Sequence, residues 1–103
     1  MDKKMIYDKK NPNEETLNAI CLVINAIKTR HILANTVFKF HNIFVGKQYM
    51  DFTICFICLE SGGVQAYISG SGSCSMSAKP VAYSLRRIES LFKQAESIEL
   101  ITF

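Results

Sequence analysis

The sequence has no long hydrophobic run and none of the signals that direct a chain into or across a membrane. Its longest uninterrupted apolar stretch covers residues 19–24, whereas a membrane-spanning helix needs about 18 apolar residues or more. The first residues are charged, and no apolar segment with a small-residue cleavage site follows them, so we predict no secretory signal. We therefore expect a cytoplasmic protein without a membrane partner.

An excess of charge of one sign is also missing. Twelve Lys and Arg residues oppose nine Asp and Glu residues, which leaves a formal net charge of +3. Four of the twelve cations lie within the first ten residues: Lys3, Lys4, Lys9 and Lys10. Proteins that bind nucleic acids usually concentrate Lys and Arg on one face, so this distribution does not favour a nucleic-acid partner.

The apolar content, in contrast, is sufficient for a core. The chain has 103 residues, of which 49% are hydrophobic, with seven Phe and four Tyr. This is typical of one domain, and we assign residues 1–103 to it. Residues 1–10 are polar apart from Met5, Ile6 and Tyr7; we expect this segment to be mobile or to add a short edge strand. Four cysteines without a secretory signal indicate reduced thiols.

Two helices are predicted from apolar residues that recur at helical spacing. The first covers about 12–31, with Asn11 as N-cap and Pro12 at the first helical position. His31 would then lie in its last turn, where a cation complements the helix dipole. Pro80 opens the second helix, whose apolar stripe is formed by Val81, Leu85, Ile88, Phe92 and Ala95.

Alternating residues between the helices predict antiparallel strands. They cover about 36–41, then 43–45 either as a second strand or as a continuation beyond a bulge at Asn42, then 50–59 and 64–70. The alternating tail from Ile98 also suits a strand. The predicted fold is α+β, an antiparallel sheet of about four strands flanked by an N-terminal and a C-terminal helix in the order α-β-β-β-β-α, with short terminal strands as additions.

No constellation of residues predicts catalysis, a metal or a cofactor. Cys55 and Cys58 have the CxxC spacing, but they lie within one strand, where residues three apart point to opposite faces. We therefore interpret them as structural thiols. The two histidines, His31 and His41, have no partner pattern in the sequence, and the lone strand carboxylate of Asp51 supports no acid–base scheme. We predict that the protein is not an enzyme.

The segment 70–77 is rich in Gly and Ser and has two interpretations. Glycine-rich backbone before a helix can bind anions through its N–H groups, with Lys79 nearby. The alternative, which the spacing favours, is an edge strand or loop whose small residues let another backbone approach. The candidate ligand-binding residues are Gly70, Ser71, Gly72, Ser73, Lys79, Arg86 and Arg87.

This part of the chain resembles a double-stranded-RNA-binding domain in the order of its elements. From Phe38 to Phe92 three strands and a helix follow one another, with the first helix before them. The resemblance implies that Gly70, Gly72, Lys79, Arg86 and Arg87 contact phosphates. The lysine cluster of that family is reduced here to Lys79, which Pro80 follows.

The strand 50–59 carries apolar residues on both of its faces. If Phe52, Ile54, Phe56 and Cys58 pack beneath the helices, the other face is still apolar, and such surface is rarely left to water. We therefore predict a homodimer. The candidate interface residues are Cys55, Ile57, Leu59, Ile101 and Phe103.

Two functions are compatible with these observations. The first is a small non-catalytic interaction protein, homodimeric, that acts by binding another protein. The alternative is a nucleic-acid or phosphate-ligand binding module that uses residues 70–73 and the basic face of the second helix.

Overall fold

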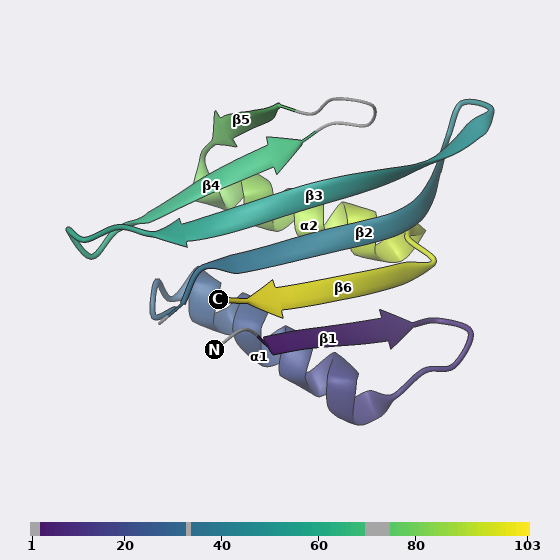
Figure 1. Cartoon of the computed structure of the whole chain (residues 1–103), viewed down its shortest axis with the longest axis horizontal. Helices are drawn as coiled ribbons and strands as arrows, with labels where there is room; N and C mark the ends of the chain where they lie inside the picture. Colours follow the sequence, from purple (N-terminus) through teal and green to yellow (C-terminus); the bar gives the residue numbers. More distant parts are fainter. Residues whose placement is uncertain (1–2, 33, 70–74) are drawn as a thin grey trace.

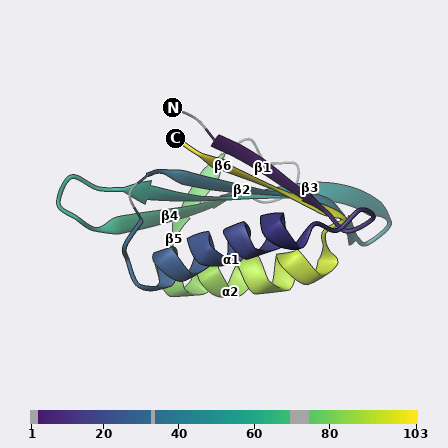
Figure 2. The same ribbon diagram turned by 90° about the horizontal axis from the view of Figure 1, so that it is seen from below.

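The protein has two layers, a six-stranded antiparallel sheet and a pair of helices. The computed structural model describes residues 3–32, 34–69 and 75–103. Both helices lie on the same face of the sheet (Figure 2). The elements are β1 (Lys3–Asp8), α1 (Glu14–Lys28), β2 (Thr36–Val45), β3 (Gln48–Cys58), β4 (Val64–Ser69), β5 (Met76–Lys79), α2 (Val81–Gln94) and β6 (Ser97–Thr102).

The strands are arranged in the order β1-β6-β2-β3-β4-β5 (Figure 1). Strands β2 to β5 pair antiparallel in the order of the chain. The alternation predicted β2, β3 and β4, whereas the sequence left open whether a strand or a loop precedes the second helix, where β5 lies. The last strand, β6, lies between β1 and β2 and pairs antiparallel with both of them. The expectation of an antiparallel α+β fold is confirmed, but the count of about four strands was too low. The two terminal strands, β1 and β6, pair with each other. Because they come from opposite ends of the chain, local sequence patterns do not indicate this pairing.

The first helix begins two residues later than the sequence suggested. Asn13, not Asn11, is the N-cap: it has an extended backbone, and its side-chain oxygen accepts a hydrogen bond of 3.1 Å from the N–H of Thr16. The N–H of Asn11 instead bonds to the carbonyl of Asp8 in the preceding turn. Glu14 and Glu15 then occupy the first turn, where carboxylates complement the helix dipole.

The same helix ends before His31. Arg30 takes up a left-handed backbone conformation with φ of 60°. The N–H of Arg30 donates to the carbonyl of Ile27 and that of His31 to the carbonyl of Ala26, which is the Schellman pattern of a helix end. The Arg30 guanidinium also donates to the carbonyls of Ile27 and Lys28. The prediction that His31 lies in the last helical turn was therefore wrong, and Arg30 supplies the cation at this end.

Residues 36–45 form one strand with a bulge at Asn42, which is one of the two possibilities that the sequence left open. The register between β2 and β3 shifts between Phe40 and Ile43, and Asn42 has a φ of 57°, a conformation that Asn tolerates better than most residues. The bulge brings His41 and Asn42 opposite the single residue Asp51, since Phe40 pairs with Phe52 and Ile43 with Met50.

The core lies between the helices and the central strands. Phe38 and Phe40 of β2 and Phe56 of β3 are fully buried, and the ring of Phe38 meets that of Phe56 edge to face at 6.0 Å. The other fully or almost fully buried apolar residues are Ile20, Ile27, Ile43, Ile54, Ala66, Ile88, Leu91, Ala95, Ile98 and Leu100. Every strand residue in this list points to the helices, so the core occupies one side of the sheet.

The position of the N-cap can be tested by stability measurements. Asn13→Ala removes the acceptor for the Thr16 N–H and should lower the free energy of unfolding by about 1 kcal/mol. Asn11→Ala is the matched control, because it changes the same residue type two positions away. Urea unfolding followed by circular dichroism measures both. Equal losses for the two variants would contradict the assignment of Asn13 as the cap.

Candidate functional site: the open face of the sheet

The face of the sheet that points away from α1 and α2 is covered by no other described element (Figure 2). We call it the open face. Its residues follow from the register, because directly paired residues point to the same side and successive residues alternate. The side of the sheet under α1 and α2 is called the helix side below.

An apolar strip crosses the open face from β6 to β5. Ile101 pairs with Val37, Val37 with Cys55, Cys55 with Tyr67, and Tyr67 with Ala78. The first four are half-buried and Ala78 is exposed. Ile57 continues the strip along β3, and Met76 extends it on β5, with its sulfur 3.7 Å from the Cys55 Sγ. Five neighbouring strands therefore present one continuous apolar surface to solvent.

Beside this strip lies a row of charged residues centred on Glu99 of β6. Glu99 is almost buried; its carboxylate lies 2.7 Å from the Lys4 Nζ and 3.9 Å from the Lys39 Nζ. The hydrogen bond from Lys4 is the main reason why the pKa of Glu99 is below its usual value, and the charge of Lys39 acts in the same direction. Glu99 is thus held ionised by a lysine from each neighbouring strand.

His41 and Asp51, which show no partner pattern in the sequence, form a pair that could in principle take part in acid–base catalysis. The bulge places the His41 Nδ1 3.0 Å from the Asp51 Oδ2, and the Asn42 N–H donates to the other carboxylate oxygen. Burial acts to raise the pKa of Asp51, but the bonds from Asn42 and His41 outweigh it and hold the pKa below its usual value. Asp51 is exposed, and no nucleophile of the described residues bonds to His41. The pair can orient an imidazole, but it lacks the third group of a catalytic triad.

The same bulge joins the loops at this end of the sheet. The side-chain amide of Asn42 donates to Glu96, 2.7 Å away, and Glu96 forms an ion pair of 2.6 Å with Lys10. The backbone N–H of Glu96 bonds to the carbonyl of His41. Lys10 and Asn42 hold the pKa of Glu96 below its usual value. These contacts fasten the β1–α1 and α2–β6 connections to β2.

The predicted interface residues lie on or next to the open face. Cys55, Ile57 and Ile101 are within the apolar strip, half-buried. Leu59 follows the end of β3 and is 41% exposed, and Phe103 follows β6 and is 53% exposed. The sequence pattern did not indicate Val37 and Tyr67, which lie on either side of Cys55 in the strip. Their strands alternate as well, so a correct register would have revealed them.

The predicted ligand-binding residues are elsewhere. Gly70, Ser71, Gly72 and Ser73 lie outside the described residues. Lys79 pairs with the buried Ala66 and thus points to the helix side, where α2 carries Arg86 and Arg87. The basic residues and the open face are therefore on opposite sides of the sheet. None of these three cations forms an ion pair within the described part of the chain.

Cys55 and Cys58 point to opposite sides of the sheet, as the strand spacing predicted. The Cys55 Sγ contacts Met76 on the open face, whereas the Cys58 Sγ lies 3.7 Å from the carbonyl oxygen of Ile32. Burial raises the pKa of the Cys55 thiol, which disfavours the reactive thiolate. Across residues 3–32, 34–69 and 75–103, no three His, Cys, Asp or Glu side chains are grouped to hold a metal ion.

Comparisons of this chain with protein-family models, with curated proteins and with solved structures found no match. Neither α1 nor α2, the two helices of the described residues, has the length and apolar character to cross a membrane.

The role of Glu99 predicts how stability depends on pH. A carboxylate whose pKa is lower in the folded state stabilises the fold above its unfolded pKa of about 4, and this contribution is lost as the pH falls through the folded pKa. Glu99→Gln should therefore lower stability at pH 7, by about 1 kcal/mol because Lys4 is largely in solvent. In Glu99→Gln the free energy of unfolding should also fall less steeply than in the unmodified chain as the pH is lowered from about 5 to about 3.

The matched control for this experiment is Glu89→Gln, an exposed carboxylate 3.9 Å from Lys28. Urea unfolding at several pH values measures both variants. If Glu99→Gln is as acid-sensitive as the unmodified chain, Glu99 does not carry the predicted contribution.

Proposed function

We propose that this chain is a small non-catalytic interaction protein whose open face forms a homodimer interface. The observation that carries the proposal is the continuous strip Ile101–Val37–Cys55–Tyr67–Ala78 on a face that neither helix covers. Contiguous apolar surface of this kind marks association sites in soluble proteins. The protein would then act through contacts that the assembled dimer presents to another protein.

The dimensions of the face suit a second copy of the same chain. Six strands at a spacing of about 4.8 Å form a surface about 25–30 Å wide. A stable interface covers about 800 Å² on each partner, which requires most of such a face. Two copies related by a two-fold axis would bring strip against strip, because an isologous contact uses the same patch on both chains.

The charges on the open face also favour a copy of the same chain over a strongly charged partner. Lys4 and Lys39 offset two of the three carboxylates that the register places on this face, those of Glu99, Asp51 and Asp8, so the face has an excess of only one negative charge when His41 is neutral. Such a weak excess gives a highly acidic or basic partner little electrostatic complementarity. Burial of the apolar strip, rather than long-range attraction, would supply most of the binding free energy.

A non-catalytic role is supported by the position of the His41–Asp51 pair. Both residues lie on the broad open face. The structure has a groove between α1 and α2 and a second hollow that is lined by His31 and Ile32 among others, and neither His41 nor Asp51 lines either of them. Catalytic residues are more commonly gathered in a concave pocket that excludes water.

The dimer can be tested with a charge placed in the strip, next to the central Cys55. Val37→Lys should raise the dimer dissociation constant more than tenfold, since a buried, unpaired ammonium opposes association. Leu22→Lys is the control: Leu22 is 71% exposed on α1, on the helix side, and should leave the dimer intact. Sedimentation equilibrium measures the dissociation constants, and circular dichroism verifies that both variants fold. A chain that is monomeric at micromolar concentration, or that loses its dimer equally in both variants, would contradict the proposal.

The alternative function, binding of nucleic acids or phosphate ligands, is favoured by one specific observation. Lys79, Arg86 and Arg87 are close in the chain and free of ion pairs within the described residues. If they bind phosphates, the double variant Arg86→Ala/Arg87→Ala should elute from heparin at clearly lower salt, because each phosphate contact steepens the salt dependence. Lys28→Ala/Lys47→Ala removes the same charge elsewhere and serves as the control. Equal elution of the two double variants would exclude a specific role for the arginines.

A further inference from the structure

A groove lies between the two helices, on the side of the molecule opposite to the open face. The chain direction of α1 is opposite to that of α2, and the two helices lie side by side over the sheet (Figure 2). The groove has a volume of about 420 Å³, within the range of small-molecule sites, about 300–1,000 Å³. It is lined by Leu17, Cys21, Ile24, Asn25, Lys28, Ile88, Glu89, Phe92 and Lys93.

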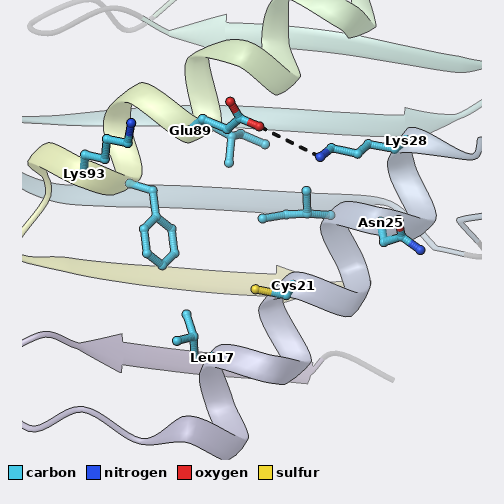
Figure 3. A pocket seen from close by; sticks show the side chains of 9 residues that line it. Leu17, Cys21, Asn25, Lys28, Glu89 and Lys93 are labelled. Carbon is cyan, nitrogen blue, oxygen red and sulfur yellow. Dashed lines mark ion pairs between the residues drawn. The ribbon is translucent and has the colours of Figure 1, made fainter.

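The wall of the groove is mainly apolar. Leu17 and Ile24 of α1 face Ile88 and Phe92 of α2, and all but the buried Ile88 are partly accessible. The thiol of Cys21 points from α1 toward α2 in the middle of the groove (Figure 3). Cys21 is an exposed free cysteine. A ligand that fills the groove must therefore be apolar over most of its length and must pass this thiol.

The two ends of the groove differ in charge. At one end, Lys28 and Glu89 face each other with their charged atoms 3.9 Å apart (Figure 3). At the other end Lys93 has no ion pair within the described residues. Lys9 reinforces the positive charge there: its Nζ lies 5.7 Å from the centre of the Phe92 ring and donates to the carbonyls of Phe92 and Lys93. Lys9 thereby satisfies the carbonyls of Phe92 and Lys93. The Lys93 ammonium, one helical turn after Glu89, forms no ion pair with another described residue.

We propose that this groove binds a small anionic amphiphile, a single hydrocarbon chain that ends in a carboxylate. The carboxylate pairs with Lys93, and the chain lies over Phe92 and Ile88 toward Ile24. A chain without the carboxylate leaves Lys93 unused, and a cationic head group is repelled by Lys93 and Lys9. This site is independent of the dimer interface, since the sheet and its core separate the groove from the open face.

The test uses the alkylation of Cys21 as a local probe. Decanoate should slow the reaction of Cys21 with iodoacetamide, measured by peptide mass spectrometry below the micelle-forming concentration. N-acetylcysteine added to the same sample is the internal reference, because it reports any change in iodoacetamide reactivity that does not depend on the groove. If decanoate leaves the Cys21 rate unchanged, or slows both thiols equally, the groove is not the binding site.

Head-group recognition is tested with matched ligands and variants. Decanol and decyltrimethylammonium have the same chain without the negative charge and should protect Cys21 only at much higher concentrations. Lys93→Gln should raise the decanoate concentration for half-protection roughly fivefold, the usual scale for one accessible ion pair. Lys79→Gln, a lysine outside the groove, should not change it. Equal protection by the three ligands, or an unchanged value in Lys93→Gln, would overturn the proposal.

Discussion

The insertion of β6 between β1 and β2 determines the rest of this structure. β6 pairs with β1 from Lys3↔Thr102 to Asp8↔Ser97, and with β2 from Thr36↔Thr102 to His41↔Ser97. Because β6 is antiparallel to both neighbours, β1 and β2 run parallel to each other with one strand between them. By the same alternation β5 and β6 are parallel, with three strands between them. Each of these parallel pairs is joined by a helix, α1 in the first and α2 in the second.

The handedness of those two connections explains why one face is open. A connection between parallel strands of one sheet is almost always right-handed. The step from β1 to β2 crosses the sheet in one direction, and the step from β5 to β6 crosses it in the other. The strands of the second pair also point the opposite way, so the two reversals cancel. Right-handed connections must then put both helices on the same side, as Figure 2 shows. The open face is thus a consequence of strand order.

Features that depend on residues close together in the chain could be predicted from the sequence. Strands β2, β3 and β4 and the body of both helices depend on neighbours within a few residues, and alternation or helical spacing indicates them. The same alternation left open whether a bulge or a new strand begins at Asn42. The strand count failed because the pairing of Met5 with Leu100 joins the two ends of the chain. The N-cap was misplaced by two residues because Asn11 and Asn13 are both good caps, and only the Asp8 turn decides between them.

The candidate site was predicted in part for the same reason. The apolar residues at 55, 57 and 101 are visible in the sequence. That they form one strip could not be predicted, because it depends on the pairing of Val37 with both Ile101 of β6 and Cys55 of β3. The contact between His41 and Asp51 needs the bulge, which places two residues of β2 opposite one of β3. That neither α1 nor α2 covers the open face could be predicted only from the strand order and the handedness of the two helical connections. The residue pattern therefore predicted that the sheet has apolar residues on both faces. The topology determines that one of these faces, the open face, is left uncovered.

The charged row gives the open face a further property that suits association. Burying an ion in an interface is costly unless a partner of opposite charge accompanies it. Glu99 already has the ammonium groups of Lys4 and Lys39 beside it, and Asp51 already has hydrogen bonds with His41 and the N–H of Asn42, all from the same chain. A second chain would therefore not need to supply a counter-charge to Glu99 or a new hydrogen bond to Asp51. The fit of two copies would then depend on the shape of the apolar strip, where Val37 and Tyr67 lie on either side of Cys55, and the charged row would limit how far one copy slides over the other.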